Sequence, residues 1–190
     1  GMLIAVVAAH RFVPVAPRTD ILGAELQSIS VRVGERRGQT VEHLMAKHGH
    51  EVRVSRVQRG DDQFVPARTD RIEPGDVVAI TCPVQQVNAV IAGLGDRHAA
   101  QLTDDRSRLD FRRMVVSNND VVGRPLSSLR LTHRHGATIT RIRRGETDLL
   151  ANLDMVLEPG DRVRVVAPPD KMAEIALELG DNERRVSEFH

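Results

Sequence analysis

The sequence predicts an α+β protein made of two tandem small domains, each with the element order β-α-β-β-β-α, related by internal duplication. A Glu-Pro-Gly-Asp tetrapeptide occurs twice, at 73–76 and 158–161, and each copy precedes an apolar run that leads through a proline into an amphipathic segment. The 85-residue spacing of the tetrapeptides also relates Gly38 to Gly123, Leu44 to Leu129, Arg56 to Arg141, Arg59-Gly60 to Arg144-Gly145, Pro83 to Pro168 and Leu94-Gly95-Asp96 to Leu179-Gly180-Asp181. One offset held over so many turn and core positions indicates a duplicated structural unit.

The repeated tetrapeptide is typical of a tight turn that opens a strand. Proline presets φ and glycine accepts a positive φ at the centre of such a turn. After the second turn, Val163 and Val165 alternate with Arg162 and Arg164, which is the period of a half-buried β-strand.

The remaining elements follow from the same patterns. Ile29, Val31 and Val33 alternate with polar residues as in a strand, and Thr40 can cap a short helix with Val41 and Leu44 on its apolar face. In the first copy we expect further strands at 52–57, 64–65 and 77–81, and a helix that ends at Leu94. In the second copy we expect strands at 112–117, 137–143, 148–151 and 162–167, and helices at 125–131 and 170–179.

These elements divide the chain into five parts: an N-terminal segment 1–25, a first domain 26–96, a linker 97–110, a second domain 111–181 and a C-terminal tail 182–190. Domains of roughly 75 residues bury modest cores. We therefore expect them to pack against each other and the chain to form a homodimer.

Composition excludes several functions. With 41% hydrophobic and 28% charged residues and a net charge of +1, the chain has the composition of a globular protein without a global field for nucleic acid. Trp and Tyr are absent, and platforms that stack single-stranded bases need aromatic side chains, so we expect no nucleic-acid partner. The single cysteine, Cys82, is expected to be a core residue.

The second copy carries the segments 123–129, 136–145 and 157–166, which resemble the C-terminal RCK domain, also called the TrkA-C domain. The resemblance covers about 70 residues in each copy. Two such domains in series, with no nucleotide-binding RCK half before them, are similar to the cytosolic insert of the aspartate:alanine exchanger family of bacterial transporters.

This resemblance implies a regulatory, ligand-sensing domain pair at the cytoplasmic face of the plasma membrane, joined to transmembrane domains of the same chain. It also implies that the apolar run 2–9, too short to span a bilayer, is the end of a membrane helix. Two alternatives remain open: a soluble regulatory subunit of a potassium uptake or channel system, and a purely structural dimerisation module. The transported solute does not follow from these residues.

Five arginines are the candidate ligand-binding residues: Arg56, Arg59, Arg141, Arg143 and Arg144. Arg141 and Arg143 share a strand face, and a guanidinium group binds phosphate with two hydrogen bonds. The resemblance implies a regulatory nucleotide such as cyclic di-AMP at the interface of the two copies. The alternative interpretation is a solvated strand face paired with nearby carboxylates.

Two His-x-His pairs recur at the 85-residue offset: His48 with His50, and His133 with His135. No cysteine or carboxylate cluster accompanies them, so solvated loop histidines are the default interpretation and no metal is predicted. A metal site would form if the pairs met across the interface of the copies. The chain also lacks the Gly-x-Gly-x-x-Gly and Gly-Lys-Ser/Thr phosphate loops and a nucleophile elbow, so we predict that it is not an enzyme.

Overall fold

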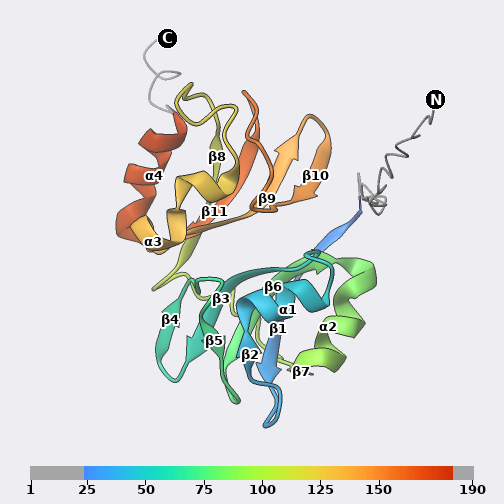
Figure 1. Cartoon of the computed structure of the whole chain (residues 1–190). Coiled ribbons are helices and arrows are strands. Elements are labelled where there is room, and N and C mark those ends of the chain that lie inside the picture. The colour runs from blue at the N-terminus through green and yellow to red at the C-terminus, as the bar shows by residue number, and fades with distance from the viewer. Residues whose placement is uncertain (1–23, 182–190) are drawn as a thin grey trace, which may run out of the picture.

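The computed structural model describes residues 24–181 and shows two units, each a sheet with helices on one face (Figure 1). The predicted membrane-helix end at 2–9 and the predicted tail 182–190 lie outside the described residues. Within residues 24–181, no helix is long and apolar enough to cross a membrane.

The first unit contains a five-stranded sheet in the order β4-β3-β6-β1-β7 and a two-stranded sheet of β2 and β5. Its elements are β1 (Leu26–Val33), β2 (Gln39–Thr40), α1 (Val41–Lys47), β3 (Arg53–Arg59), β4 (Asp62–Phe64), β5 (Arg71–Ile72), β6 (Val77–Pro83), the 3₁₀ turn η1 (Val84–Gln86), α2 (Val87–Leu94) and β7 (Gly95–Arg97).

The second unit contains a four-stranded antiparallel sheet in the order β10-β9-β11-β8. Its elements are β8 (Asp110–Val115), the 3₁₀ turn η2 (Leu126–Leu129), α3 (Leu131–His135), β9 (Thr138–Arg144), β10 (Thr147–Leu150), β11 (Arg162–Ala167), the 3₁₀ turn η3 (Pro169–Lys171) and α4 (Met172–Leu179). The β10-β9-β11-β8 order repeats the β4-β3-β6-β1 order of the first unit, which confirms the predicted duplicated α+β fold.

The duplication extends to an irregularity of the sheet. In both units the register of the central pairing shifts by one residue, at Ser55 of β3 and at Thr140 of β9. The hydroxyl of Ser55 donates to the carbonyl of Ala79 at 3.2 Å, and that of Thr140 donates to the carbonyl of Arg164 at 3.4 Å. A β-bulge re-aims the side chains next to it, so β3 and β9 turn in the same way.

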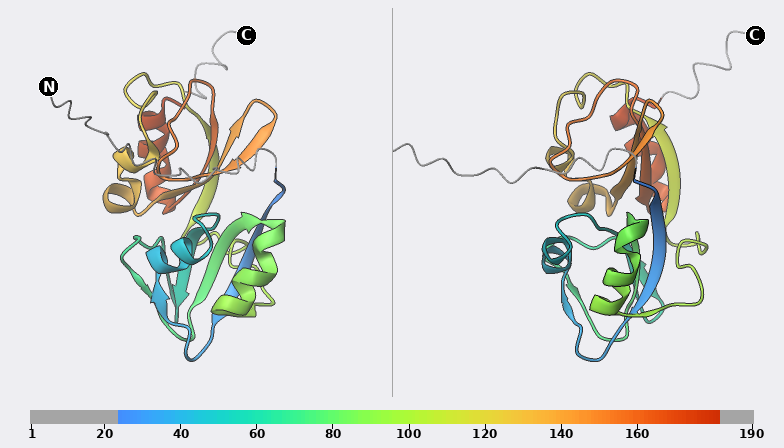
Figure 2. Two further views of the ribbon diagram at one scale, coloured as in Figure 1. Left: turned by 45° about the vertical axis from the view of Figure 1, so that its right-hand side comes forward. Right: turned by 90° about the vertical axis from the view of Figure 1, so that its right-hand side faces the viewer.

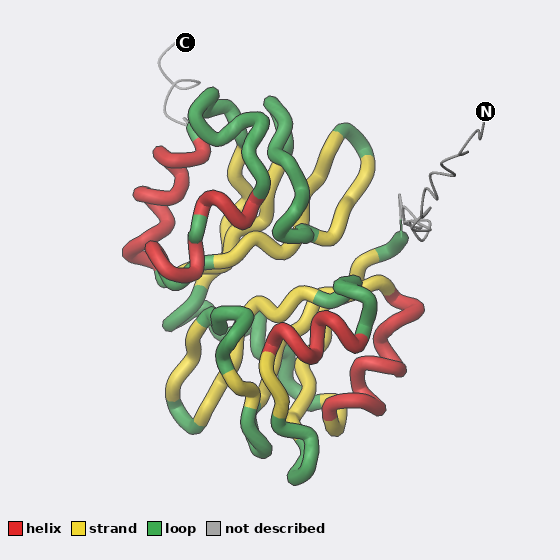
Figure 3. Tube along the Cα trace, in the orientation of Figure 1, coloured by secondary structure: helices red, strands yellow, loops and turns green. Residues whose placement is uncertain are grey.

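The helices of each unit cover one face of its sheet (Figure 3), and each unit has its own hydrophobic core. In the first core, Leu44 of α1 and Val90 of α2 pack on Ile29, Val31 and neighbouring strand residues. In the second, Ile175 and Leu179 of α4 pack with residues of all four strands and of η2 and α3. The predicted cap of α1 is confirmed, because the Thr40 hydroxyl accepts from the backbone N–H of His43 at 3.2 Å.

The predicted helix at 125–131 is wrong as a single element. Residues 126–129 form a 3₁₀ turn, Arg130 has φ 49° and ψ 35°, and a separate helix begins at Leu131. A residue in the left-handed region cannot continue a right-handed helix, so the segment breaks there. The first copy has the unbroken helix α1 at the corresponding place.

The linker runs along the face of the first sheet that points away from α1 and α2 (Figure 2). Leu102 packs there against Val77 and Ala79. Leu109 packs with Val65 of the first unit and Val166 of the second. The linker is therefore part of the packing that joins the two units.

Candidate functional site

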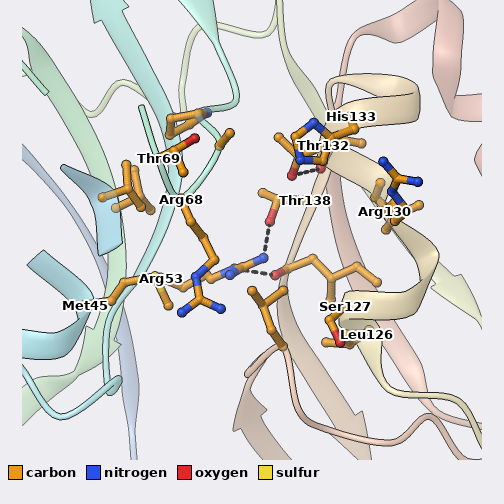
Figure 4. Close-up of a pocket in the computed structure, with 18 residues that line it drawn as sticks. Met45, Arg53, Arg68, Thr69, Leu126, Ser127, Arg130, Thr132, His133 and Thr138 are labelled. Atoms are coloured by element: carbon orange, nitrogen blue, oxygen red, sulfur yellow. Dashed lines mark hydrogen bonds between the residues drawn. The ribbon is translucent and has the colours of Figure 1, made fainter. Parts of the chain in front are cut away.

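A cavity of about 480 Å³ lies between the two units, on the side where β3 faces β9 (Figure 4). Its walls are largely apolar, with a few polar and charged side chains. The lining residues are Val41, Met45, Arg53, Val54, Pro66, Ala67, Arg68, Thr69, Leu126, Ser127, Arg130, Leu131, Thr132, His133, Ala137, Thr138, Ile139 and Leu153. Cavities of roughly 300–1,000 Å³ with this character are typical small-molecule sites.

The lining follows the internal duplication. Several positions occur as pairs separated by 85 residues, one from each unit: Val41 with Leu126, Met45 with Arg130, Arg53 with Thr138, Val54 with Ile139 and Arg68 with Leu153. The cavity is therefore built around a pseudo-twofold relation between the copies, within a single chain.

Arg53 of the first unit forms hydrogen bonds with the second unit. Its Nη2 donates to the hydroxyl of Thr138 at 2.7 Å, and its Nε donates to the carbonyl of Ile139 at 3.2 Å (Figure 4). Burial lowers the pKa of Arg53 to about 10, and the positive charge of Arg68 adds to this effect. Arg53 therefore remains a cation at neutral pH, in the wall of the cavity.

Two further arginines line the cavity, one from each unit. Arg68 forms an ion pair with Glu42, which raises the pKa of Arg68 and lowers that of Glu42. Arg130 precedes α3 in a left-handed backbone conformation, and its side chain makes no hydrogen bond or ion pair within residues 24–181. Non-glycine residues held at positive φ occur often at binding sites, where the surrounding structure imposes the strain.

The candidate residues Arg59 and Arg144 bind carboxylates of the repeated turns. Arg59 donates to Asp76 through Nε and Nη2, at 3.0 and 2.8 Å, and Arg144 donates to Asp161 in the same way, at 2.9 and 2.8 Å. Each aspartate also accepts a backbone N–H from the first residue of its turn. The two arginines thus hold the Glu-Pro-Gly-Asp turns against β3 in the first unit and β9 in the second.

The candidate residue Arg56 is fully buried beneath the linker. Its Nη1 donates to the backbone carbonyls of Leu102, Asp105 and Leu109, at 3.3, 2.8 and 3.1 Å. Burial lowers its pKa, partly offset by Asp105 and Asp110. Arg56 therefore stabilises the path of the linker over the first sheet.

The candidate residues Arg141 and Arg143 lie on the face of the second sheet that points away from its helices. With three further arginines and one carboxylate they line a pocket of about 130 Å³; the lining residues are Arg113, Arg141, Arg143, Asp148, Arg162 and Arg164. We refer to the five arginines of this pocket as the arginine face. Among the predicted candidates, the structure thus brings Arg141 and Arg143 together and places Arg56, Arg59 and Arg144 elsewhere.

The two histidine pairs do not meet. Within residues 24–181, no three His, Cys, Asp or Glu side chains lie close enough to hold a metal ion. His48 is buried at the end of α1 and His50 is exposed in the following turn. His135 is buried with its Nε2 3.1 Å from Glu178 of α4, whereas His133 is exposed and lines the cavity between the units.

The sequence patterns did not identify the arginines of the cavity, Arg53, Arg68 and Arg130. Arg53 stands where the second copy has Thr138, and Arg130 stands where the first copy has Met45. A charge present in only one copy, where the other copy has a neutral residue, is the signal that could have identified them.

Comparison with known proteins identifies a domain family that matches the chain twice. The model of the TrkA-C domain matches residues 27–95 and 111–180. An uncharacterized transporter of Geobacter sulfurreducens is 43% identical over 166 residues, which are 86% of this chain and 30% of that protein. An uncharacterized transporter of Cutibacterium acnes is 34% identical over 189 residues, which are 99% of this chain and 36% of that protein. The chain thus spans about a third of the length of the curated relatives it matches.

Among solved structures, the RCK_C domain dimer of S. agalactiae BusR in complex with c-di-AMP is 24% identical, with a TM-score of 0.34. The match covers 37% of this chain and 95% of that one. Because both TrkA-C matches fall on the two halves of the duplication and together cover most of the chain, this protein belongs to the TrkA-C domain family and carries two of its domains in tandem.

Proposed function

We propose that this chain is the regulatory, ligand-sensing domain pair of a bacterial membrane transporter, placed at the cytoplasmic face of the membrane and without catalytic activity of its own. In this proposal the sensing unit comprises the domains 26–96 and 111–181 joined by the linker 97–110, and the aspartate:alanine exchanger family is the class of transporter that such a pair would serve. The curated relatives are transporters about three times as long as this chain, which leaves room for transmembrane domains.

The observation that carries the proposal is the cavity between the copies. Its volume of about 480 Å³ suits a small molecule, and five pairs of its lining residues occupy equivalent positions in the two units. A ligand with its own twofold symmetry would present the same groups to both halves of such a site, as in an isologous interface.

A cyclic dinucleotide such as cyclic di-AMP fits this chemistry. The guanidinium groups of Arg53, Arg68 and Arg130 offer donors for phosphate oxygens, and arginine binds phosphate with paired, charge-assisted hydrogen bonds. Apolar side chains such as Met45, Leu126 and Leu153 offer surface for the bases. The proposed ligand is therefore a nucleotide that carries two phosphate groups and two bases.

The proposed mechanism couples ligand binding to the arrangement of the two units. A ligand bound between the units favours the arrangement in which both units contact it, by its difference in affinity for the two arrangements. Because Arg53 already joins β3 to β9, a change at this contact alters how one sheet lies on the other. We propose that the attached transmembrane domains respond to that change.

The experiment is a thermal-shift titration of the 190-residue chain with cyclic di-AMP, ATP, AMP, aspartate and divalent metals. A ligand at about 100 times its Kd adds roughly 2.7 kcal/mol to stability, a shift of several degrees for domains of this size. Arg130→Ala should abolish the shift, since its guanidinium has no other partner among residues 24–181.

The matched control is Arg124→Ala. Arg124 is an exposed arginine of the same unit, outside the cavity, and its Nη1 donates to the carbonyl of Asp120 at 3.3 Å. A saturable shift that Arg124→Ala keeps and Arg130→Ala loses supports the proposal. The absence of a shift with every compound would favour the purely structural module instead.

A further inference from the structure

The arginine face concentrates positive charge on one side of the second sheet. Five guanidinium groups and a single carboxylate, that of Asp148, line its pocket, so four positive charges are unmatched within the lining. Arg141 and Arg164 are partly buried, whereas Arg113, Arg143 and Arg162 are exposed. The pocket thus has two arginines at its base and three that solvent reaches.

The strand register places these arginines directly opposite one another. Arg164 of β11 pairs with Arg113 of β8 on one side and with Arg141 of β9 on the other, and Arg162 pairs with Arg143 in the adjacent row. Like charges opposite each other in a sheet are destabilising. Burial and the neighbouring positive charges, first that of Arg141 and then that of Arg113, lower the pKa of Arg164.

The fold itself does not require four of these five arginines. By register, the first unit has Ser30, Gln58, Val77 and Ala79 where the second has Arg113, Arg143, Arg162 and Arg164. In the first unit this face is covered by the linker, since Leu102 packs on Val77 and Ala79 and its backbone N–H donates to Ser30 at 2.8 Å. One copy of the fold therefore forms with small and neutral residues at positions where the other copy accumulates charge.

The charges are also poorly matched by the rest of the chain. Arg141 donates to two neutral acceptors of the first unit, the Leu26 carbonyl at 3.0 Å and the Ser28 hydroxyl at 3.4 Å, and Arg164 stacks on the ring of Phe111. Arg143 pairs with the exposed Glu146. Arg113 and Arg162 make no side-chain hydrogen bond or ion pair within residues 24–181.

We propose that the arginine face binds a phosphate group, at a second ligand site separate from the cavity between the copies. The pocket of about 130 Å³ is below the range of whole-nucleotide sites, so it suits a single phosphate group with the rest of the molecule outside. Guanidinium groups match the oxygens of phosphate in pairs, and a multivalent anion offsets the repulsion between the opposed arginines.

Two kinds of molecule carry a phosphate group that this face would bind, and the experiment distinguishes them. One is a soluble phosphate or nucleotide, and the other is the headgroup of an anionic phospholipid. For the first, the 190-residue chain is titrated calorimetrically with inorganic phosphate and with ATP. For the second, the chain is sedimented with vesicles of phosphatidylcholine, with and without phosphatidylglycerol.

The test variant is Arg113→Gln/Arg162→Gln, which removes two exposed arginines without partners among residues 24–181. The matched control is Arg36→Gln/Arg124→Gln, which removes two exposed arginines outside the pocket and lowers the net charge equally. Arg164→Lys is a third variant, which retains the charge at the base of the pocket and removes the paired donors. Unchanged circular dichroism spectra confirm that each variant folds.

The expected result is saturable binding to phosphate, ATP or anionic vesicles that weakens roughly tenfold or more in Arg113→Gln/Arg162→Gln and also in Arg164→Lys. The control should bind within about twofold of the parent chain. Equal loss in the test and control variants, or no binding to any of the three probes, would overturn the proposal. So would self-association of the parent chain that is abolished by Arg113→Gln/Arg162→Gln, since a second copy would then occupy the face. Binding of cyclic di-AMP in the cavity is measured on the same variants and should be unchanged, so the two proposals fail independently.

Discussion

Residues that both copies share have structural roles, whereas residues present in one copy are candidates for function. Both copies have an arginine at the same position, Arg59 in the first and Arg144 in the second. Each binds a buried aspartate of its turn with the same pair of hydrogen bonds. The side chain of Asp161 is 1% exposed and that of Arg144 is 32% exposed. The pair is therefore a structural contact that depends on the arginine to compensate a buried carboxylate.

Arg144→Ala should destabilise the chain by about 2–3 kcal/mol, because it leaves the Asp161 carboxylate buried without its cation. The measurement is urea unfolding followed by circular dichroism. The adjacent Arg143→Ala serves as control, since its partner Glu146 is exposed and such pairs contribute below about 1 kcal/mol. Equal effects of the two substitutions would contradict the structural role of Arg144.

His48 should make stability depend on pH. Burial, with a smaller effect of Lys47, lowers the pKa of His48 below its usual 6.5 in the folded state. The unfolded state therefore takes up the proton first, so the contribution of neutral His48 is complete above about pH 6.5 and is lost as the pH falls below that value. His48→Gln should reduce the slope of unfolding free energy against pH below pH 6.5.

The control for this measurement is His43→Gln, at an exposed position of the same helix. It should leave the slope close to that of the parent chain. A slope in His48→Gln identical to that of the parent chain would show that His48 does not carry the effect.

At the scale of elements, strands and turns could be predicted well because their signals are local. Proline and glycine at the turn centres and the alternation of valines require no knowledge of the rest of the fold. The break at Arg130 could not be predicted, since its left-handed backbone is imposed by the packing of η2 and α3 on the second core. The pairing of β2 with β5 was missed as well, because strands of two residues have no periodicity to detect.

The two copies also differ at that small sheet for a local reason. Thr40 and Arg71 pair as part of β2 and β5, whereas the equivalent residues Pro125 and Val156 form an isolated bridge. Proline has no N–H to donate, so the ladder cannot extend through it.

Arg130 should show a trade-off between stability and binding. Arg130→Gly relieves the cost of a positive φ, about 1 kcal/mol, and Arg130→Ala does not. Both substitutions remove the guanidinium from the cavity, so both should lose the proposed ligand. Thermal unfolding should therefore rank Arg130→Gly above Arg130→Ala, with equal loss of binding in titration; a lower unfolding temperature for Arg130→Gly would contradict the inferred strain.

At the scale of the molecule, the sequence predicted two copies of one fold but not how they pack. Arg56 was a candidate ligand residue because its strand pattern resembles that of Arg141; the structure buries it because the linker folds back over the first sheet. Whether the linker covers a sheet depends on contacts between segments far apart in the sequence. Residue spacing within one copy carries no information about such contacts. The same reason explains why Arg53, which contacts the other unit, was not selected.

The central claim is that the two copies in one chain form a complete ligand site. The most direct measurement is isothermal titration calorimetry of the 190-residue chain with cyclic di-AMP, which reports stoichiometry as well as affinity. The account predicts one ligand bound per chain, lost in Arg130→Ala and retained in Arg124→Ala. One ligand per two chains would place the site between separate copies of the protein, and no binding at any concentration would contradict the claim that the cavity between the copies is a nucleotide site.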